Sequence, residues 1–392
     1  MNDKIIKLAD KNACTGCGAC ADACFKSCIT MVREGLHTYP QIDAEFCIGC
    51  QKCMKTCPSI NPFNSVEVSI QKYYACWHKD LSVVMTSTSG GVGTALAEHA
   101  IDCDYYVVGV VLTSEVKHVI ATNKEDIQAF KGSKYVQSNS IGIYQECMKA
   151  IKKGHKILFI GTPCQTEAMK RILPSSLQDS LITCSIICHG VNSSFVWNDY
   201  RNNLEKKCKS HIEKYNFRYK SHGWQKQNGG PNLRVSYEMI SGKKADMPSW
   251  RNLFHYWFGQ HFIMRPSCFK CQYRTEDRHS DIVIGDFWRV EKVLDGMNTY
   301  NGVSAVITTT AQGEEFLHTN PYLNATPVDA QKSKSALKGL INRKSEETQN
   351  KEILRMRTFE QEYNQNGFEY MAKKYPCPTY IDQIINKIKS MI

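Results

Sequence analysis

Eight cysteines near the start of the chain form two runs of the same spacing, and this spacing could support redox chemistry. The runs are Cys14-x2-Cys17-x2-Cys20-x3-Cys24 and Cys47-x2-Cys50-x2-Cys53-x3-Cys57. Three thiolates at such spacing wrap one face of an iron-sulfur cube, and the fourth cysteine of each run reaches the other cluster in two-cluster ferredoxins. We therefore predict two four-iron clusters, the first held by Cys14, Cys17, Cys20 and Cys57 and the second by Cys47, Cys50, Cys53 and Cys24.

A zinc-binding module is the alternative for these cysteines, although zinc sites usually show isolated Cys-x2-Cys pairs or mixtures of cysteine and histidine. The first run departs from the pattern because Phe25 follows Cys24, whereas Pro58 follows Cys57. Proline fixes a turn there, and ligation does not need it. Cys28 lies four residues after Cys24, and both a buried small hydrophobic residue and a stand-in ligand remain open for it.

The elements that must position these residues follow from length and pattern. A chain of 392 residues, 42% of them hydrophobic, suggests two or three globular domains. From about residue 70, short β-branched and aromatic runs alternate with helical stretches, which predicts α/β layering with a mixed sheet. We expect strands at residues 72–77, 105–112, 156–160, 181–187, 282–284 and 303–309, and helices at residues 92–100, 141–153, 165–173 and 195–208.

Two later regions do not follow this alternation of strands and helices. Residues 215–247 contain a strand-like run after two glycines and a proline, which predicts an antiparallel hairpin inserted into the α/β body. After about residue 330 the chain becomes polar and helical, and we expect a peripheral helical tail rather than a catalytic element.

Composition limits the class of protein. No apolar run of about 18 residues occurs, and the first ten residues are too short and polar for a signal peptide, so we expect a soluble cytoplasmic protein. The 19 cysteines are then reduced thiols rather than disulfides. The net charge of +11 omits the negative charge of bound clusters, and the lysines and arginines are dispersed. A solvated basic surface is favoured over a nucleic-acid footprint.

Three glycine-containing segments could hold a phosphate-bearing cofactor. STSGGVGT at residues 87–94 lies between an expected strand and an expected helix, where backbone N–H groups can face a phosphate. KGSKYVQS at residues 131–138 supplies a cation and an aromatic ring, and GTPCQ at residues 161–165 follows a strand, where ligands bind in open α/β sheets. Structural turns and a basic surface loop explain the same letters equally well.

Four later cysteines could gather from three loops. Cys164, Cys188 and the pair Cys268-x2-Cys271 could hold a third four-iron cluster, although isolated buried cysteines are common. His189 could be an acid or base, or a histidine hydrogen-bonded beside a cluster. The segment RHSDIVIGDFW at residues 278–288 could contribute to a site or form an edge strand with a capped turn.

Taken in order, the motifs STSGGVGTAL, KGSKYVQS, FIGTPCQ, CHGV, RPSCFKC and SDIVIGDFW behind a two-cluster segment resemble the family of coenzyme F420 hydrogenase and dehydrogenase beta subunits. The resemblance covers about residues 10–310. It implies a flavoprotein whose FAD exchanges electrons with iron-sulfur clusters, and it implies a third-cluster role for Cys164, Cys188, Cys268 and Cys271. It assigns FAD binding to Ser87, Thr88, Ser89, Gly90, Gly91, Lys134, Tyr135, Gln137, Gly161 and Thr162.

The expected architecture is an α+β ferredoxin-like two-cluster domain (residues 1–65), an FAD-binding α/β domain with a mixed sheet (66–325) and a helical C-terminal tail (326–392). The expected activity is an oxidoreductase that couples the clusters and FAD to a small molecule or an F420-like deazaflavin. An acidic ferredoxin or flavodoxin is the expected electron carrier. Two alternatives remain: a non-catalytic electron-transfer subunit with a catalytic partner chain, and a zinc and nucleic-acid-binding protein.

Overall fold

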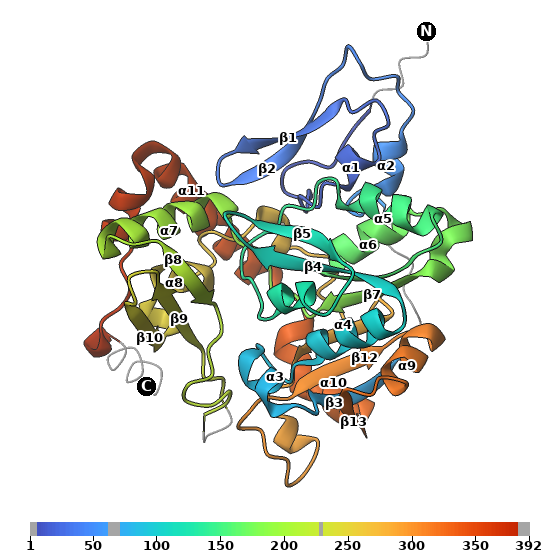
Figure 1. Ribbon diagram of the computed structural model, residues 1–392. Coiled ribbons are helices and arrows are strands. Elements are labelled where there is room, and N and C mark those ends of the chain that lie inside the picture. The colour runs from blue at the N-terminus through green and yellow to red at the C-terminus, as the bar shows by residue number, and fades with distance from the viewer. Residues whose placement is uncertain (1–5, 62–70, 227–229, 383–392) are drawn as a thin grey trace.

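The computed structural model describes residues 6–61, 71–226 and 230–382, in which the strands form three separate sheets (Figure 1). The first sheet is an antiparallel hairpin in the part of the chain that carries both cysteine runs, which we call the cysteine segment (residues 6–61). A short helix begins just before the third cysteine of each run. The elements are α1 (Ala19–Asp22), β1 (Ile29–Glu34), β2 (His37–Ile42) and α2 (Lys52–Thr56).

The second sheet is the centre of the molecule and has eight strands in the order β13-β3-β12-β11-β7-β6-β4-β5. Neighbouring strands are parallel from β11 through β7 and β6 to β4, and antiparallel elsewhere. The prediction of an α/β body with a mixed sheet is therefore confirmed. The strands are β3 (Lys72–His78), β4 (Tyr105–Leu112), β5 (Val116–Ala121), β6 (Lys156–Gly161), β7 (Leu181–Ile186), β11 (Ile282–Asp286), β12 (Ser304–Thr308) and β13 (Leu323–Val328).

Helices cover both faces of this sheet because its strands are apolar on both sides. In β6, Leu158 packs with α4 on one face, whereas Ile157 and Phe159 pack with α5 and α6 on the other. The first face also carries α9, and the second also carries α10. These helices are α4 (Val92–Asp102), α5 (Ile143–Lys152), α6 (Pro163–Ile172), α9 (Ala311–His318) and α10 (Ala330–Ile341).

The third sheet lies beside the main one and has the order β10-β9-β8 (Figure 1). The predicted hairpin in residues 215–247 is thus part of a separate three-stranded sheet. Its aromatic core includes Trp197, whose ring lies 5.2 Å from that of Phe254 at an interplanar angle of 71°. The elements around this core are α7 (Ser194–Cys208), β8 (Ile212–Asn216), β9 (Arg234–Met239), β10 (Lys244–Pro248), α8 (Leu253–Gly259) and α11 (Glu346–Lys374).

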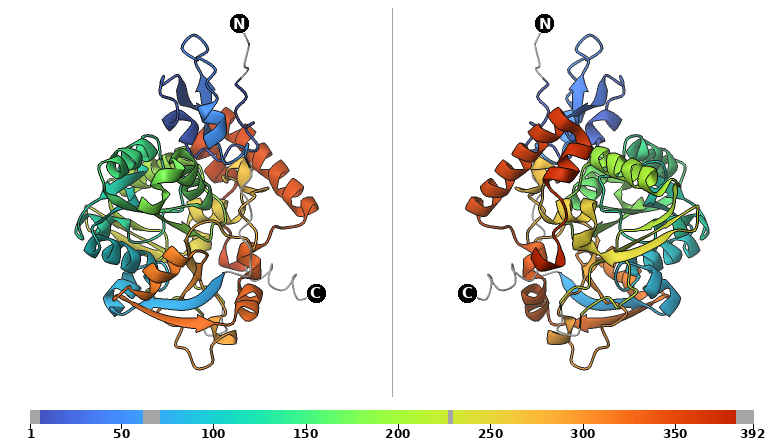
Figure 2. Two further views of the ribbon diagram at one scale, coloured as in Figure 1. Left: turned by 90° about the vertical axis from the view of Figure 1, so that its right-hand side faces the viewer. Right: turned by 90° about the vertical axis from the view of Figure 1, so that its left-hand side faces the viewer.

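The chain after about residue 330 is helical, as expected, but its helices α10 and α11 are not a peripheral tail. Leu337 and Ile341 of α10 are buried against the main sheet, and Phe359 of α11 is buried in the aromatic core. Polar composition misled the sequence-based prediction because each helix buries only one narrow face. In addition, β13 spans residues 323–328, so the expected boundary at residue 326 falls inside a strand. Figure 2 shows α11 running up to the cysteine segment.

The six expected strands and four expected helices are confirmed, each within about three residues at its ends. The two edge strands of the main sheet, β5 and β13, were not expected from the sequence. The segment at residues 278–288, for which an edge strand was one alternative, instead contributes the central strand β11, between β12 and β7. Among the described helices, none combines the length and the apolar composition that crossing a membrane requires.

One edge of the main sheet collects the ends of several strands, and we call it the carboxyl edge. There β6, β7 and β11 end, and β12 begins opposite the end of β11, since Ser304 pairs with Asp286. β3 also ends at this edge and leads through α3 (Leu81–Thr86) to the STSGG segment and α4. Parallel strands of open α/β sheets place ligands at this kind of edge.

Candidate functional site

Four of the paired-run cysteines surround a cavity that faces the rest of the protein, which we call the inner cysteine cavity. It encloses about 330 Å³, including the part open to solvent, and is lined by Cys14, Cys17, Cys20 and Cys57. Three of these thiols come from the first run and one from the second. The structure therefore brings together the four residues that the spacing assigns to one cluster.

The other four thiols line a second cavity at the far end of the segment, which we call the outer cysteine cavity. It also encloses about 330 Å³ and is lined by Cys24, Cys47, Cys50 and Cys53, together with Cys28. Cys50 is exposed at its rim. Although burial opposes it, hydrogen bonds from Cys28 and from neighbouring backbone N–H groups lower the pKa of the Cys24 thiol.

The donor sets of both cavities fit four-iron clusters. Each cavity presents the four thiols that the spacing assigns to one cluster, and thiolates are the ligands that such clusters take. In the described parts of the chain, no three His, Cys, Asp or Glu side chains converge closely enough to hold a single metal ion. The thiols instead surround a volume that is several atoms wide.

The four later cysteines also lie together, and we call them the third thiol set. Cys164 is in the first turn of α6, Cys188 follows β7, and Cys268 and Cys271 come from the loop before β11. Burial and the nearby Cys268, Cys164 and Cys271 sulfurs raise the pKa of Cys188 well above its ordinary value. Burial and a neighbouring Cys271 likewise raise the pKa of Cys268 to about 12. This donor set also fits a four-iron cluster.

The inner cavity and the third thiol set are neighbours. Burial raises the pKa of Cys17 to about 12, and the next largest cause is the Cys164 sulfur. Arg265 lies between the two groups, with its Nη2 3.7 Å from the Cys14 sulfur, and its charge opposes the rise of the Cys164 and Cys268 pKa values. The order along the molecule is therefore outer cavity, inner cavity, third thiol set.

Buried hydrogen bonds fix the cysteine segment on the body. The Asp22 carboxylate accepts from the backbone N–H groups of Gly142 (2.7 Å) and Tyr144 (3.1 Å). The Arg265 guanidinium donates to the carbonyl oxygens of Cys14 (2.8 Å) and Thr38 (2.7 Å). Arg265 is 0% exposed, so these bonds are shielded from water. The sequence analysis did not identify either residue as functional, although Arg265 begins the RPSCFKC motif.

Gln137 lies on the cysteine segment as well. Its side-chain amide donates to the Gly16 carbonyl at 3.1 Å and accepts from Arg265 at 3.0 Å. Gln137, a predicted FAD-binding residue, therefore contacts the loop between Cys14 and Cys17 at the inner cysteine cavity. Gly16 has φ +67°, and an added Cβ would lie 2.5 Å from both the Gln137 amide and Arg265, so only glycine fits this contact.

The segment at residues 87–91 is held tightly at the carboxyl edge. The Ser89 hydroxyl donates to the Val303 carbonyl at 2.8 Å, and the Gly90 N–H donates to the Ser304 hydroxyl at 3.0 Å. A Cβ on Gly90 would lie 2.5 Å from the Cys76 carbonyl, so the backbone approaches two strands too closely for any side chain. Ser87 donates to the Val83 carbonyl, and Gly91 immediately precedes α4.

A second predicted segment, residues 131–138, lies against the first. The Ser133 N–H donates to the Thr88 hydroxyl at 2.8 Å. The Lys134 ammonium donates to the carbonyls of Ala129 and Lys131, and burial lowers the Lys134 pKa to about 7. An anion beside Lys134 would favour its charged form. The Tyr135 hydroxyl accepts a hydrogen bond from Arg218 at 3.3 Å.

The third predicted segment, residues 161–165, connects the carboxyl edge to the third thiol set. Gly161 ends β6, and Thr162 caps α6, with its N–H and hydroxyl both donating to the Gln165 side chain. The Thr162 hydroxyl oxygen lies 3.2 Å from the Cys164 sulfur. A predicted cofactor residue is therefore in contact with a predicted cluster ligand.

Charged and aromatic residues that the sequence analysis did not assign also gather at this edge. Arg218 pairs with Asp286 at 3.2 Å, and the Trp224 indole N–H donates to Asp286 at 3.1 Å. Trp224 stacks on Trp288 with ring centroids 4.0 Å apart. The Lys220 ammonium is buried and donates to the carbonyls of Val84, Ser89 and Asn301. Asp286 and Trp288 belong to the IGDFW motif, and this motif was the sequence signal that could have identified them as site residues.

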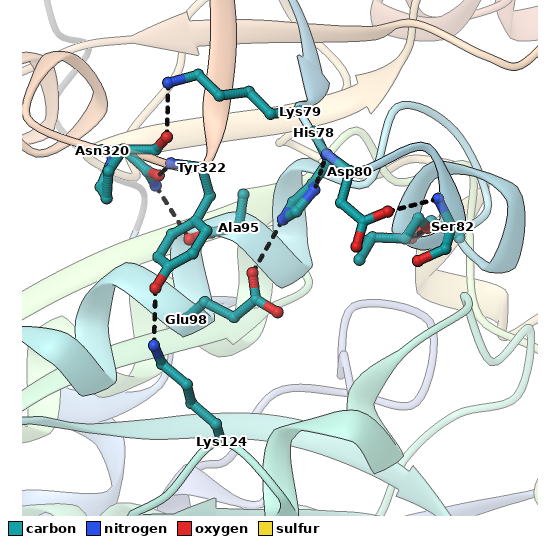
Figure 3. Close-up of polar contacts among 12 residues, drawn as sticks. His78, Lys79, Asp80, Ser82, Ala95, Glu98, Lys124, Asn320 and Tyr322 are labelled. Carbon is teal, nitrogen blue, oxygen red and sulfur yellow. Dashed lines mark hydrogen bonds and ion pairs between the residues drawn. The ribbon is translucent and has the colours of Figure 1, made fainter.

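His78 hydrogen-bonds to the segment at residues 87–91 through its backbone, and its ring lies between Asp80 and Glu98 (Figure 3). Its backbone N–H donates to the Gly90 carbonyl at 2.7 Å. Its ring Nδ1 accepts from the Asp80 N–H, so Nε2 carries the proton and donates to Glu98 at 2.9 Å. The imidazole is thereby fixed between the end of β3 and α4.

His189 is hydrogen-bonded beside the third thiol set. Its Nε2 lies 3.2 Å from Nε2 of His261. The other ring nitrogen of His261, Nδ1, lies 3.1 Å from the Glu352 carboxylate. Of the two alternatives from the sequence, this arrangement matches the hydrogen-bonded histidine next to Cys188.

Three family models match successive parts of the chain. Residues 13–60 match a 4Fe-4S dicluster domain. Residues 73–143 and 154–331 match, respectively, the N-terminal and C-terminal parts of the coenzyme F420 hydrogenase/dehydrogenase beta subunit.

Curated relatives cover parts of the chain. One of the subunits of the F420H2 dehydrogenase of Methanosarcina mazei is 25% identical over 201 residues, which is 48% of this chain and 56% of that protein. An uncharacterised protein of Methanocaldococcus jannaschii is 30% identical over 199 residues, 42% of this chain and 54% of that one. The chain thus spans about half the length of these two relatives. An uncharacterised ferredoxin of M. jannaschii is 29% identical over 65 residues, 17% of this chain and 79% of that one.

Among solved structures, the F420-reducing [NiFe] hydrogenase complex from Methanosarcina barkeri contains a chain with a TM-score of 0.41 and 15% identity. The match covers 75% of this chain and 91% of that one.

Proposed function

Because this chain belongs to the family of coenzyme F420 hydrogenase and dehydrogenase beta subunits, we propose that it is an iron-sulfur flavoprotein that passes electrons between four-iron clusters and FAD. The observation that carries the proposal is the unbroken series of thiol sets: Cys17 neighbours Cys164, and Cys164 contacts Thr162 at the carboxyl edge. Bound clusters would supply one-electron transfer, and bound FAD would supply exchange between single electrons and a hydride.

The chain's own residues position these groups. Four thiols of each set would ligate one cluster, and Arg265 supplies positive charge between the inner cavity and the third set. At the carboxyl edge, the first N–H groups of α4 and the half-buried Lys134 would bind the pyrophosphate of FAD. The FAD-binding residues of the proposal are Ser87, Thr88, Ser89, Gly90, Gly91, Lys134, Tyr135, Gln137, Gly161 and Thr162, and the contacts of Gln137 place it on the side of the inner cavity.

A one-electron carrier would dock at the outer cavity. Phe25, Phe46 and Ile48 are 58%, 62% and 59% exposed, and Phe25 and Ile48 line this cavity. Lys26 also lines it, and Lys52 lies over the Phe25 ring at 5.2 Å. These positive charges would steer an acidic ferredoxin or flavodoxin. At the other end, the substrate would be an F420-like deazaflavin or another small molecule that exchanges a hydride with FAD.

One observation favours a second candidate, a non-catalytic electron-transfer subunit. The M. mazei relative is named as a subunit, and this chain spans only 56% of it. Stoichiometric co-purification of a second protein, together with no oxidoreductase activity of the isolated chain, would favour this candidate.

The test is quantification of iron, acid-labile sulfide and flavin on one sample purified without oxygen. We expect about twelve irons and one FAD per chain, since three four-iron clusters are proposed. About eight irons would remove the third cluster from the proposal. A sample without flavin would overturn the flavoprotein function, and zinc without iron would overturn the electron-transfer function.

A further inference from the structure

Five thiols, rather than four, surround the outer cysteine cavity. The fifth is Cys28, which belongs to neither spaced run and is 6% exposed. Its sulfur lies 3.3 Å from the sulfur of Cys24, and Cys47 is its other thiol neighbour. Because this buried thiol contacts one predicted cluster ligand and lies next to another, it is within reach of a cluster bound by those ligands.

A tight turn brings Cys28 back over Cys24. The Ser27 N–H donates to the Cys24 carbonyl at 2.9 Å, and Ser27 adopts the left-handed conformation with φ 52°. The Cys28 carbonyl then accepts from the Asp43 N–H at 2.8 Å, which anchors this residue at the start of the β1–β2 hairpin. The separation of the two sulfurs is comparable with the displacement that one χ1 rotamer change gives a cysteine sulfur.

The second run provides an internal comparison. Cys57 is the counterpart of Cys24, and the residue four positions later is Asn61 instead of a cysteine. The Asn61 amide donates to the carbonyls of Met54 (2.6 Å) and Cys57 (3.2 Å), so it caps the backbone and offers no thiol. The inner cavity is lined by four cysteines in the described chain.

We propose that Cys28 is a functional fifth thiol of the outer cluster site. In the intact protein its S–H group donates a hydrogen bond to the Cys24 ligand sulfur. When the Cys24 side chain is absent, Cys28 replaces it: its proton leaves to solvent, its thiolate forms the iron–sulfur bond that Cys24 otherwise forms, and no electron is exchanged. The inference rests on the proposed function, since it requires a cluster in this cavity.

The first experiment compares full-length variants purified without oxygen: Cys24→Ala, Cys57→Ala and the double variant Cys24→Ala/Cys28→Ala. We expect Cys24→Ala to keep the iron and sulfide content of the wild type, with a changed electron paramagnetic resonance spectrum of the reduced cluster. The double variant and Cys57→Ala should each lose about four irons.

The outcomes separate the inference from the proposed function. If Cys24→Ala loses as much iron as the double variant, Cys28 is not a replacement ligand. If the double variant also keeps all its iron, the cluster does not depend on Cys28 and the inference is overturned. If the wild type contains no iron, the proposed function itself fails.

A second experiment tests the hydrogen bond in the intact site, using Cys28→Ala and Cys28→Ser. Both should keep the full iron content. Loss of the donor in Cys28→Ala should lower the reduction potential of the outer cluster, because hydrogen bonds to cluster sulfurs favour the more negative reduced state. A tenfold change in the reduction equilibrium corresponds to about 59 mV for one electron. Cys28→Ser retains a donor and should lie closer to the wild type, and equal potentials in all three proteins would contradict the hydrogen bond.

Discussion

Cys188 and Cys184 are four residues apart at the end of β7 and have different surroundings. Cys184 is on the strand and 0% exposed in the core between the sheet and α4. Cys188 lies beyond the end of the strand. Burial raises the pKa of its thiol, and the nearby Cys268, Cys164 and Cys271 sulfurs raise this pKa further. The buried Cys184 and the half-buried Cys188 therefore have different expected roles.

Replacing each with alanine distinguishes these roles. Cys188→Ala should lower the iron content by about four per chain, because it removes one of the four proposed ligands of the third cluster. Cys184→Ala should leave the iron content unchanged and lower the free energy of unfolding by about 1 kcal/mol through the small cavity it creates. The measurement is iron per chain on both variants. Equal iron content in the two would defeat the assignment of Cys188 as a ligand.

At the scale of elements, the connection from β3 to α4 depends on close backbone packing. Gly90 lies against β3 and β12, where an added Cβ would be 2.5 Å from the Cys76 carbonyl and 2.9 Å from the Ser304 nitrogen. Gly93 lies three residues later inside α4, where an added Cβ would meet only the Ile284 side chain at an ordinary 3.5 Å.

The two glycines should respond oppositely to alanine. Gly90→Ala should destabilise the protein by about 1–3 kcal/mol, since two strands would have to separate. It should also reduce bound flavin, because it displaces the segment proposed to hold FAD. Gly93→Ala should be neutral or stabilise by up to about 1 kcal/mol, because alanine has a higher helix propensity than glycine. Urea unfolding and flavin content check both, and a Gly90→Ala protein as stable as Gly93→Ala would show that the strands can adjust.

At the scale of the whole molecule, Arg265 joins the cysteine segment to the body. It donates to the carbonyls of Cys14 and Thr38 and lies 4.7 Å from the centre of the Tyr39 ring. Arg33 also spans the two parts, with its guanidinium 4.1 Å from the Phe195 ring, but its side chain is exposed. Of these two arginines, Arg265 alone is shielded from water.

Arg265→Met should loosen the cysteine segment, because buried carbonyls left without a donor cost about 1–3 kcal/mol each. Amide hydrogen exchange should become at least about tenfold faster within residues 6–61 and change little in β6. Arg33→Met is the matched control and should leave both rates near those of the wild type. Uniformly faster exchange throughout Arg265→Met would instead indicate that Arg265 supports the whole fold.

Local sequence patterns predicted much of the fold, whereas contacts between residues far apart in the chain could not be predicted. The central strands were predictable because β-branched runs such as residues 105–112 alternate with helices. The edge strands β5 and β13 are less continuously apolar and were missed. Asp22 and Arg265 could not be identified, since their partners lie 120 and 251 residues away and no local spacing encodes such contacts. Gln137 was assigned by motif alone, and its bonds to the loop at the inner cysteine cavity depend on how the two parts dock.

The exchange of Cys24 and Cys57 between the two cavities makes the cysteine segment indivisible. Each cavity is lined by three thiols from one run and the fourth from the other. Cutting the chain in the turn between β1 and β2 would leave two fragments, and neither would contain a complete set of four spaced cysteines for one cavity. A deletion that removed one run would therefore leave both cavities without a full set of spaced thiols, so the two runs have to be kept together in any truncated or transplanted form of the segment.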